Sequence, residues 1–391
     1  MLRDYQQDAS DAAVACLKRG MWNGLLVMPT ACGKSFVIAD IASRLDSPLI
    51  VFAPTREIVL QNYEKIRLAG MNDVGIYSAS LGEKNIRKIT LATIGSVHNH
   101  MEDFRLFKYV IVDEAHRVDA SSGMYRDYLT AREDRCVIGL TATPYRLSGF
   151  MGCTKTTFLT RLQPRIYDKV VYVCQVNDMM DRGYLCKPQY FDMIDKIAFK
   201  LKNVKLNTTG MDYDEKSLQE EYERSNFARD LLSWTLMVLK PNDGSERNGV
   251  VVFTRFVREA EVLKAGLRGH GVIAETVTAK TPNDVRKAIV DDFRCGRIKV
   301  VANAGCLGEG FDYPALDTVI IASPTRSLTR WCQMVGRILR PYSGKKAWVL
   351  DLSGNYRKFG KMEDMRIENL SSTNQWVVTS RGRQLTGIMD N

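Results

Sequence analysis

The length and composition of the chain exclude several classes of protein. It has 391 residues, more than one typical domain needs, and 45% of them are apolar and 26% charged, as in ordinary globular proteins. No apolar run approaches the roughly 18 residues that a membrane-spanning helix requires. The nine cysteines are scattered, with no CxxC pair, which argues against both a zinc site and a disulfide framework.

The amino terminus and the net charge bear on location and partners. The first residues, MLRDYQQDASDAA, lack the basic patch and apolar stretch of a secretory signal, so we expect a cytoplasmic protein. The net charge of +10 favours a polyanionic partner, and almost all of the basic excess lies after residue 150. An ordinary solvated basic surface would give the same charge, so this observation does not identify the partner.

Short aliphatic runs, each followed by a helical pattern, recur in the first part of the chain. They predict an α/β fold with a parallel sheet covered by helices on both faces. The predicted strands are residues 25–28, 49–52, 110–112 and 137–140. The helix after the first strand has the spacing of one buried stripe, made of Phe36, Ile38, Ile41, Ala42 and Leu45.

The same alternation returns in the second half, at residues 250–253, 298–302, 319–322 and 348–350. Two lobes of one fold class are therefore predicted. Between them the signals weaken, and we expect a linking region with strands around 170–173 and a helix from about 215 to 238. The tail after Ser371 is short and polar, and we expect it to be disordered. The predicted boundaries are 1–160, 161–240, 241–355 and 356–391.

A phosphate-binding loop is predicted between the first strand and its helix, in the segment MPTACGKS, residues 28–35. A loop in that position points backbone N–H groups at an anion, Lys34 reaches the outer phosphates, and the Ser35 hydroxyl meets Mg²⁺. Met28 stands where such loops usually begin with glycine. A chance GKS between a strand and a helix is the alternative. The predicted phosphate-binding residues are Thr30, Ala31, Cys32, Gly33, Lys34 and Ser35.

Two acids end the strand at residues 110–112, in the segment VIVDEAHR. Asp113 at the carboxyl end of such a strand is placed to hold Mg²⁺ through water, and Glu114 to polarise an attacking water as general base. A pair of helix-capping acids is the alternative for this dipeptide alone. Its combination with the phosphate loop favours the catalytic interpretation.

With these motifs the sequence resembles the superfamily 2 helicases, in particular the DEAH-type branch, over nearly the whole chain and in the family's motif order. The resemblance implies two RecA-like lobes, ATP and Mg²⁺ as cofactors, and a nucleic-acid partner, DNA rather than RNA. It assigns Gln6 and Arg3 to the adenine base. It also assigns His116, Thr141 and Thr143 to the coupling of hydrolysis with lobe movement.

In the second lobe the resemblance continues through GEGFDYP and QMVGRILR. It implies that Gly310 and Asp312 contact the nucleotide. Gln333, Arg337 and Arg340 then act in catalysis, and two arginines spaced by three on a helix would face the same way toward the γ-phosphate. A solvated basic helix face is the alternative for this motif taken by itself. Because the lysine and acids lie in one lobe and the arginines in the other, hydrolysis would require closure of the two.

The segments APTREIVLQ, TLATIGS and VVFTRF resemble motifs that grip the nucleic-acid backbone, and they supply Arg56, Thr93, Thr254 and Arg255 as candidates. The stretch MMDRGYLCKP, residues 179–188, is most similar to RadD-like and UvsW-like DNA helicases. RadD-like proteins carry cysteine-rich elements after the second lobe, and none follows Arg340 here. RNA helicases, duplex-DNA translocase subunits and a binding module with a degenerate nucleotide site are the alternatives.

Overall fold

A computed structural model describes residues 2–150, 153–240, 244, 246–305, 313–370, 375–387 and 389–390. The chain forms two compact units. The first comprises Met1–Arg146, Thr157–Gln175 and Arg366–Thr379, and the second Leu147–Thr156, Val176–Met365 and Ser380–Asn391. Within the part of the chain that is described, no helix is both long and apolar enough to cross a membrane.

The first unit is built on an eight-stranded sheet with the order β10-β1-β7-β6-β2-β5-β3-β4. All neighbouring strands are parallel except β3 and β4, which are antiparallel. The strands are β1 (Gly24–Val27), β2 (Leu49–Phe52), β3 (Val74–Ser78), β4 (Glu83–Lys84), β5 (Ile89–Ala92), β6 (Tyr109–Asp113), β7 (Cys136–Thr141) and β10 (Lys169–Val173).

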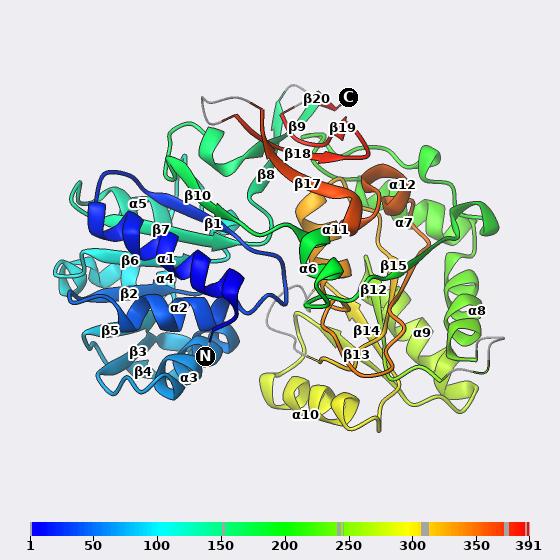
Figure 1. The fold of residues 1–391 in the computed structure, drawn as a ribbon. Coiled ribbons are helices and arrows are strands. Elements are labelled where there is room, and N and C mark those ends of the chain that lie inside the picture. The colour runs from blue at the N-terminus through cyan, green and yellow to red at the C-terminus, as the bar shows by residue number, and fades with distance from the viewer. Residues whose placement is uncertain are drawn as a thin grey trace. The chain divides into compact units, whose positions relative to one another are not determined.

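Helices cover this sheet because its central strands are apolar on both faces; every residue of β1, β2 and β5 is buried. Helices α1 (Asp4–Arg19), α2 (Lys34–Ser43) and α3 (Arg56–Leu68) pack one beside the next, in blue in Figure 1. α4 (Ile94–Val97) and α5 (Met124–Thr130) are shorter, and Tyr128 of α5 packs edge-on against Phe52 of β2. The predicted fold class of this lobe is confirmed.

The second unit contains a fully parallel six-stranded sheet, ordered β11-β16-β15-β12-β14-β13. Its strands are β11 (Gln189–Asp192), β12 (Val250–Thr254), β13 (Ala274–Thr278), β14 (Val300–Ala304), β15 (Thr318–Ala322) and β16 (Trp348–Asp351). Its helices are α6 (Val176–Asp181), α7 (Glu215–Arg224), α8 (Phe227–Leu239), α9 (Val257–Gly269), α10 (Asn283–Arg294), α11 (Leu328–Gly336) and α12 (Asn355–Phe359).

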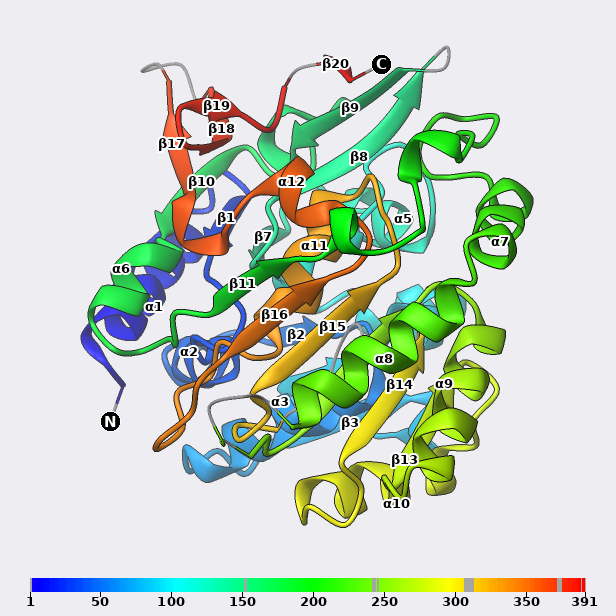
Figure 2. The same ribbon diagram turned by 90° about the vertical axis from the view of Figure 1, so that its right-hand side faces the viewer.

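The core of the second unit follows the two-residue period of its strands. Val250 and Val252 of β12 belong to one hydrophobic cluster with Leu231 of α8 and Leu263 of α9. Helix α8 lies on this face of the sheet and α11 on the other (Figure 2). Trp331 of α11 is completely buried, which anchors that helix to the unit. The fold class predicted for the second lobe is confirmed as well.

Short antiparallel strands and 3-10 turns complete the chain. The strands are β8 (Tyr145–Phe150), β9 (Cys153–Phe158), β17 (Met365–Asn369), β18 (Trp376–Ser380), β19 (Arg383–Gln384) and β20 (Met389–Asp390). The turns are η1 (Ala79–Leu81), η2 (His98–Phe104), η3 (Ala115–Arg117), η4 (Leu159–Arg161), η5 (Ile194–Lys196), η6 (Leu201–Asn203) and η7 (Met362–Asp364).

The structure differs from the predicted linking region and tail. The predicted strand around 170–173 is β10, which extends the first sheet beside β1, whereas β11 extends the second sheet beside β16. The single helix expected from 215 to 238 is two helices, because Asn226 adopts a left-handed conformation with φ of 52°. The tail is ordered where it is described: Trp376 of β18 stacks on Phe158 in the first unit.

One residue of the predicted stripe on α2 also lies elsewhere. Ile38, Ile41, Ala42 and Leu45 are buried, but Phe36 is 47% exposed and the Lys65 ammonium lies 4.8 Å from its ring centroid. Phe36 is in the first turn of α2, directly after the phosphate loop, and stays partly in solvent beneath the Lys65 side chain of α3. Four of the five residues in the predicted stripe are therefore buried. The helical period could not show where the elements that cover α2 end.

Close packing in the first unit generates a stability prediction. A Cβ on Gly139 of β7 would lie 2.6 Å from the ring of Tyr167 and 2.8 Å from the Cβ of Ala115. We therefore expect Gly139→Ala to lower the free energy of unfolding by about 1–3 kcal/mol, measured by urea unfolding. Gly269→Ala, at an open position on α9, is the control and should leave stability unchanged or slightly increased. Equal unfolding midpoints for the two variants would show that this packing is not tight.

Candidate functional site

The loop after β1 has the backbone conformation that an anion-binding turn requires. Met28 is fully buried and its N–H donates to the Thr141 carbonyl at 3.0 Å, so it continues the pairing of β1 with β7. Ala31 and Gly33 both adopt left-handed conformations, with φ of 72° and 74°, and α2 begins directly after them at Lys34. The loop therefore turns into a helix N-terminus although its usual first glycine is replaced.

Two side chains of α1 hold this loop in place. The Gln6 amide donates to the Cys32 carbonyl at 3.0 Å, and the Tyr5 hydroxyl donates to the same carbonyl at 3.2 Å. The Gln6 amide oxygen accepts the N–H of Arg3 at 3.0 Å, so both ends of the predicted adenine-binding amide are used within the protein. Tyr5 has no role in the sequence motifs. Its burial is what reveals it as a support of the loop.

Lys34 forms an ion pair with Glu114 beneath the loop. The Lys34 Nζ and the Glu114 Oε1 are 3.1 Å apart, and both side chains are largely buried. Burial alone would lower the pKa of Lys34, but the charges of Glu114 and Asp113 outweigh it and raise the pKa above its ordinary value. Glu114 has a left-handed backbone with φ of 54°, a conformation that is unfavourable for a residue with a Cβ. This left-handed residue follows β6 directly, and its conformation directs the Glu114 carboxylate toward Lys34.

Asp113 is positioned by a residue that the sequence motifs did not include. Asn62 of α3 is fully buried and donates to the Asp113 Oδ2 at 3.0 Å, while the Glu114 N–H donates to Oδ1 at 2.9 Å. Burial and the neighbouring Glu114 raise the pKa of Asp113 to about 6. A bound divalent cation would favour the ionised carboxylate, and the carboxylate and the Ser35 hydroxyl are the hard oxygen ligands that Mg²⁺ prefers. The residues therefore fit the predicted metal.

The predicted coupling residues continue the same polar chain. The second oxygen of Glu114 is 3.4 Å from the Nδ1 of His116, and that nitrogen is 3.0 Å from the Thr141 hydroxyl. The Thr143 N–H in turn donates to the Thr141 hydroxyl oxygen at 3.0 Å. The hydroxyl of Thr143 is buried and has no hydrogen-bond partner among the described residues. A connected path thus runs from the phosphate-loop lysine to the loop after β7.

The two candidate catalytic arginines of the second unit follow α11. The helix ends at Gly336, so Arg337 and Arg340 lie in the turn beyond it. The prediction that both lie on one face of a helix is therefore wrong. Ile338 and Leu339 are completely buried and anchor this turn, which leaves both arginines half-buried. Burial, with a smaller effect of Arg294, lowers the pKa of Arg340 to about 10, so it remains a cation at neutral pH.

The other predicted nucleotide contacts are placed as follows. Gln333 lies on α11 and is half-buried. Arg3 precedes α1, is exposed, and donates to the Tyr5 hydroxyl at 3.3 Å. Gly310 and Asp312 lie outside the described residues.

A pocket of about 410 Å³ opens at the carboxyl edge of the first sheet, away from the phosphate loop. Its wall includes Thr93 after β5, and Arg117 and Asp119 after β6. Arg56 does not line it: this residue starts α3 and its Nε lies 3.5 Å from Glu57. Of the predicted backbone contacts in this unit, Thr93 therefore lines this pocket and Arg56 does not.

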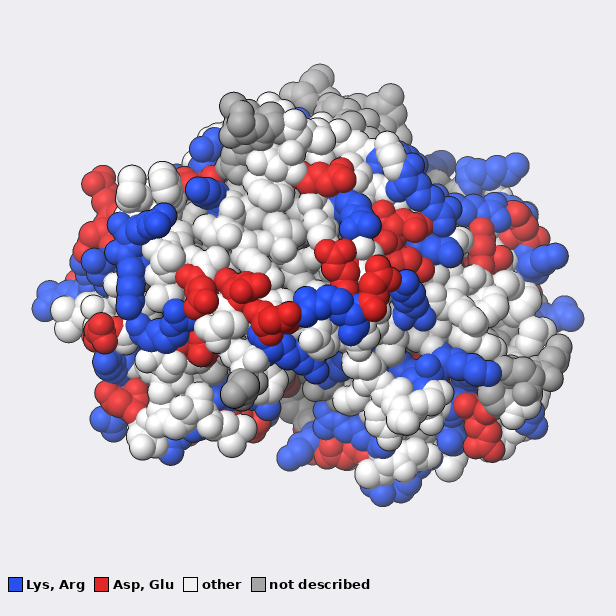
Figure 3. All heavy atoms as spheres, viewed as in Figure 1, with Lys and Arg blue, Asp and Glu red and all other residues white. Residues whose placement is uncertain are grey.

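The two candidates in the second unit are engaged within the protein. The hydroxyl of Thr254 is buried and donates to the Phe256 carbonyl at 3.1 Å. Arg255 forms ion pairs with Asp212 and Glu215. On the face drawn in Figure 3, basic and acidic side chains alternate over both units, so the net positive charge is dispersed there.

Comparison with known proteins matches a domain to each unit. Residues 1–146 match the family described as type III restriction enzyme, res subunit, and residues 230–342 match the helicase conserved C-terminal domain.

Individual proteins are similar over most of the chain. The chain is 25% identical over 377 residues to the putative ATP-dependent helicase IRC3 of Saccharomyces cerevisiae, covering 90% of this chain and 52% of that protein. It is 26% identical over 375 residues to the DNA 3'-5' translocase XPB2 of Sulfurisphaera tokodaii, covering 90% of this chain and 81% of that one. The chain thus spans about half of the yeast relative.

A solved structure has the same fold. The ATP-dependent type ISP restriction-modification enzyme LlaBIII bound to DNA superimposes with a TM-score of 0.65 at 19% identity, over 90% of this chain and 27% of that one.

The hydrogen bond from Asn62 to Asp113 generates a prediction for the metal. Asn62→Ala should raise the Mg²⁺ concentration needed for ATP binding about tenfold, because the carboxylate loses the donor that orients it. Titration of Mg²⁺ against a fluorescent ATP analogue measures this. Asn99→Ala, at an exposed position, is the control and should not change the Mg²⁺ requirement. If Asn62→Ala folds normally and needs no more Mg²⁺ than the wild type, Asn62 does not support the metal site.

Proposed function

We propose that this protein, an ATP-dependent enzyme with the two domains of a superfamily 2 helicase, acts on DNA as a helicase or translocase. It would unwind or remodel DNA in repair, recombination or replication. The observation that carries the proposal is the connected set of Lys34, Glu114, His116 and Thr141 in the first unit. This set links Lys34, which would contact the phosphates, to the loop after β7, which is expected to move when ATP is hydrolysed.

In the proposed reaction the first unit binds ATP with Mg²⁺. Backbone N–H groups of the loop and Lys34 would hold the phosphates, and Ser35 and Asp113 would hold the cation, which neutralises charge on the outer phosphates. Bound phosphate would draw Lys34 toward itself and weaken its ion pair with Glu114. Glu114 would then be available to orient the attacking water and accept its proton.

The second unit would contribute charge stabilisation. Arg337 and Arg340 would stabilise the negative charge that develops on the transferred phosphoryl group. Gln333 and the nucleotide contacts Gly310 and Asp312 belong to the same proposal. In this proposal hydrolysis would depend on residues of both units. Neither unit alone holds the complete set.

DNA is favoured as the substrate by the DNA translocase among the relatives. A translocase subunit that moves on duplex DNA for a restriction or remodelling partner is the second candidate. It is favoured by the match of residues 1–146 to a restriction-enzyme subunit. A finer placement in the DEAH-type branch, close to RadD-like and UvsW-like helicases of bacteria or phages, rests on Asp113–His116 and the segment 179–188.

Three substitutions test the catalytic assignments. Lys34→Ala and Glu114→Gln should each reduce DNA-stimulated ATP hydrolysis at least a hundredfold, and Glu114→Gln should retain ATP binding.

Arg337→Ala should lower kcat by about a thousandfold and leave nucleotide affinity nearly unchanged, because the arginine acts on the transition state. Steady-state ATPase assays and nucleotide titrations measure both quantities. Wild-type turnover in Lys34→Ala, or an affinity loss alone in Arg337→Ala, would contradict these roles.

The hydrogen bond between His116 and Thr141 is tested by an isosteric change. Thr141→Val should keep ATP hydrolysis within several-fold of wild type but lower the strand movement obtained per ATP, because the path to the loop is broken. Thr160→Val is the matched control, since its hydroxyl is also buried in the first unit and has no hydrogen-bond partner among the described residues. Translocation and ATPase rates measured on the same samples give the ratio. If both variants move DNA as efficiently as wild type, Thr141 does not couple the two processes.

One experiment separates the candidate functions. ATP hydrolysis is measured with single-stranded DNA, forked DNA, duplex DNA and RNA at one salt concentration, because phosphate contacts make every affinity salt-dependent. A helicase on DNA is stimulated most by single-stranded or forked DNA, and a duplex translocase by duplex DNA. Strongest stimulation by RNA, or none by any nucleic acid, would refute the proposal.

A further inference from the structure

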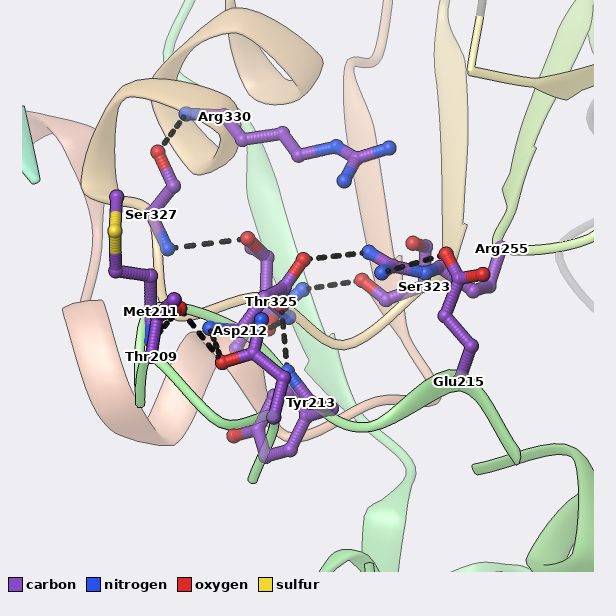
Figure 4. Close-up of polar contacts among 12 residues, drawn as sticks. Thr209, Met211, Asp212, Tyr213, Glu215, Arg255, Ser323, Thr325, Ser327 and Arg330 are labelled. Carbon is purple, nitrogen blue, oxygen red and sulfur yellow. Dashed lines mark hydrogen bonds and ion pairs between the residues drawn. The ribbon is translucent and has the colours of Figure 1, made fainter. Parts of the chain in front are cut away.

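The carboxyl edge of the second sheet carries an acidic hairpin against an arginine. Arg255 follows directly after β12, and Ser323 directly after β15, which is the neighbouring strand. In open parallel sheets, ligands bind beyond the carboxyl ends of the strands. Residues 207–215 approach this edge from outside the sheet and bring Asp212 and Glu215 to Arg255 (Figure 4).

The ion pairs at Arg255 use its guanidinium from two sides. One terminal nitrogen donates to the Asp212 Oδ2 at 2.7 Å, and the other lies 3.2 Å from the Glu215 Oε1. The Arg255 side chain is only 10% exposed, whereas that of Glu215 is 73% exposed. Two separate carboxylates thus occupy the donors that would otherwise meet two oxygens of a phosphate.

A second guanidinium lies beside this pair. Arg330 of α11 extends toward Arg255 in Figure 4, and no hydrogen bond or ion pair holds its guanidinium among the described residues. Burial lowers the pKa of Arg330, and the positive charge of Arg255 lowers it further, with Asp212 acting in the opposite direction. Nearby, the Ser323 hydroxyl is buried, with no hydrogen-bond partner among the described residues. The edge therefore holds hydrogen-bond donors that the hairpin does not satisfy.

The hairpin is a short element outside the sheet. A bridge joins Leu206 to Tyr213, the Asn207 N–H donates to the Asp212 carbonyl at 2.9 Å, and the Asp214 N–H donates to the Lys205 carbonyl at 2.9 Å. Tyr213 anchors its base in the core of the second unit, whereas the side chains of Asp212 and Glu215 are 25% and 73% exposed. Its outer turn packs on β8, where a Cβ at Gly149 would lie 2.5 Å from the Thr209 carbonyl oxygen. Such a short element can shift at lower cost than a strand of the sheet.

We propose that the hairpin at residues 207–215 is an internal competitor for nucleic acid, in which Asp212 and Glu215 occupy the place of backbone phosphates at Arg255 and Arg330. The inference rests on the proposed function, because it concerns how nucleic acid reaches the second unit. DNA binding would exchange the two carboxylates for phosphates. The acids would thus weaken DNA binding and raise the DNA concentration needed to activate hydrolysis.

The dispersed surface charge makes such a device effective. Arg255 and Arg330 lie beside each other at the carboxyl edge of this sheet, so neutralising one of them removes a large part of the attraction that this pair offers to a polyanion. The same acids would suppress non-specific contacts, because a weakly attracted polyanion cannot displace them. A correctly placed DNA strand would displace both carboxylates.

The test measures the DNA concentration that gives half-maximal stimulation of ATP hydrolysis. Asp212→Asn and Glu215→Gln should each lower it about three- to tenfold, and single-stranded DNA should bind correspondingly more tightly in fluorescence anisotropy without ATP. Glu220→Gln, on the same helix as Glu215 and exposed, changes the net charge equally and should have no effect. Glu215→Gln should fold normally even if Asp212→Asn does not, because the Glu215 side chain is mostly in solvent.

Arg255→Ala identifies the partner of the acids. Arg255→Ala alone should weaken DNA binding. In the double variant with Arg255→Ala, Asp212→Asn should no longer tighten DNA binding. Unchanged or weaker DNA binding in both acid variants would overturn the inference, since the ion pairs would then only hold Arg255 in place. Absence of any DNA stimulation in the wild-type protein would instead overturn the proposed function, so the two failures are distinguishable.

Discussion

The ion pair between Lys34 and Glu114 is the interaction on which the proposed chemistry depends. It joins the loop after β1 to the loop after β6, and β7 lies between these two strands in the sheet. Buried charges are stable only when they are paired, so the lysine and the acid hold each other in the absence of nucleotide. A triphosphate offers the lysine a stronger partner. In the proposed reaction, the free energy of that exchange would release Glu114 to act on water.

The parallel sheet is what brings these loops together. Strands β1, β7 and β6 run the same way, so their carboxyl ends and the loops that follow them share one edge. Asn62 reaches the same edge from α3 and fixes the orientation of Asp113. Tyr5 and Gln6 reach it from α1 and fix the phosphate loop. Each of these supports is buried, and each acts by removing freedom from a residue that the chemistry needs in one position.

The second unit uses its charges differently. Arg337 and Arg340 follow α11 in a turn anchored by buried residues, and burial leaves Arg340 charged but poorly solvated. A poorly solvated guanidinium interacts more strongly with a phosphate than one in water does. Arg255 is instead neutralised by Asp212 and Glu215. Arginines of the same unit thus differ in their surroundings: Arg340 is desolvated by burial, whereas Arg255 is paired with two carboxylates.

The amino-acid sequence by itself determined the two parallel α/β lobes and the main candidate residues, because hydrophobic period and strand-loop-helix motifs are local. It could not determine that Asn62 and Tyr5 support the site, that α11 ends before Arg337, or that β10 and β11 join different sheets. Nor could it show that Arg255 is paired with acids some forty residues away. These features depend on which distant segments pack together, and only the tertiary structure decides that, since burial and ion pairing arise from contacts that no local pattern contains.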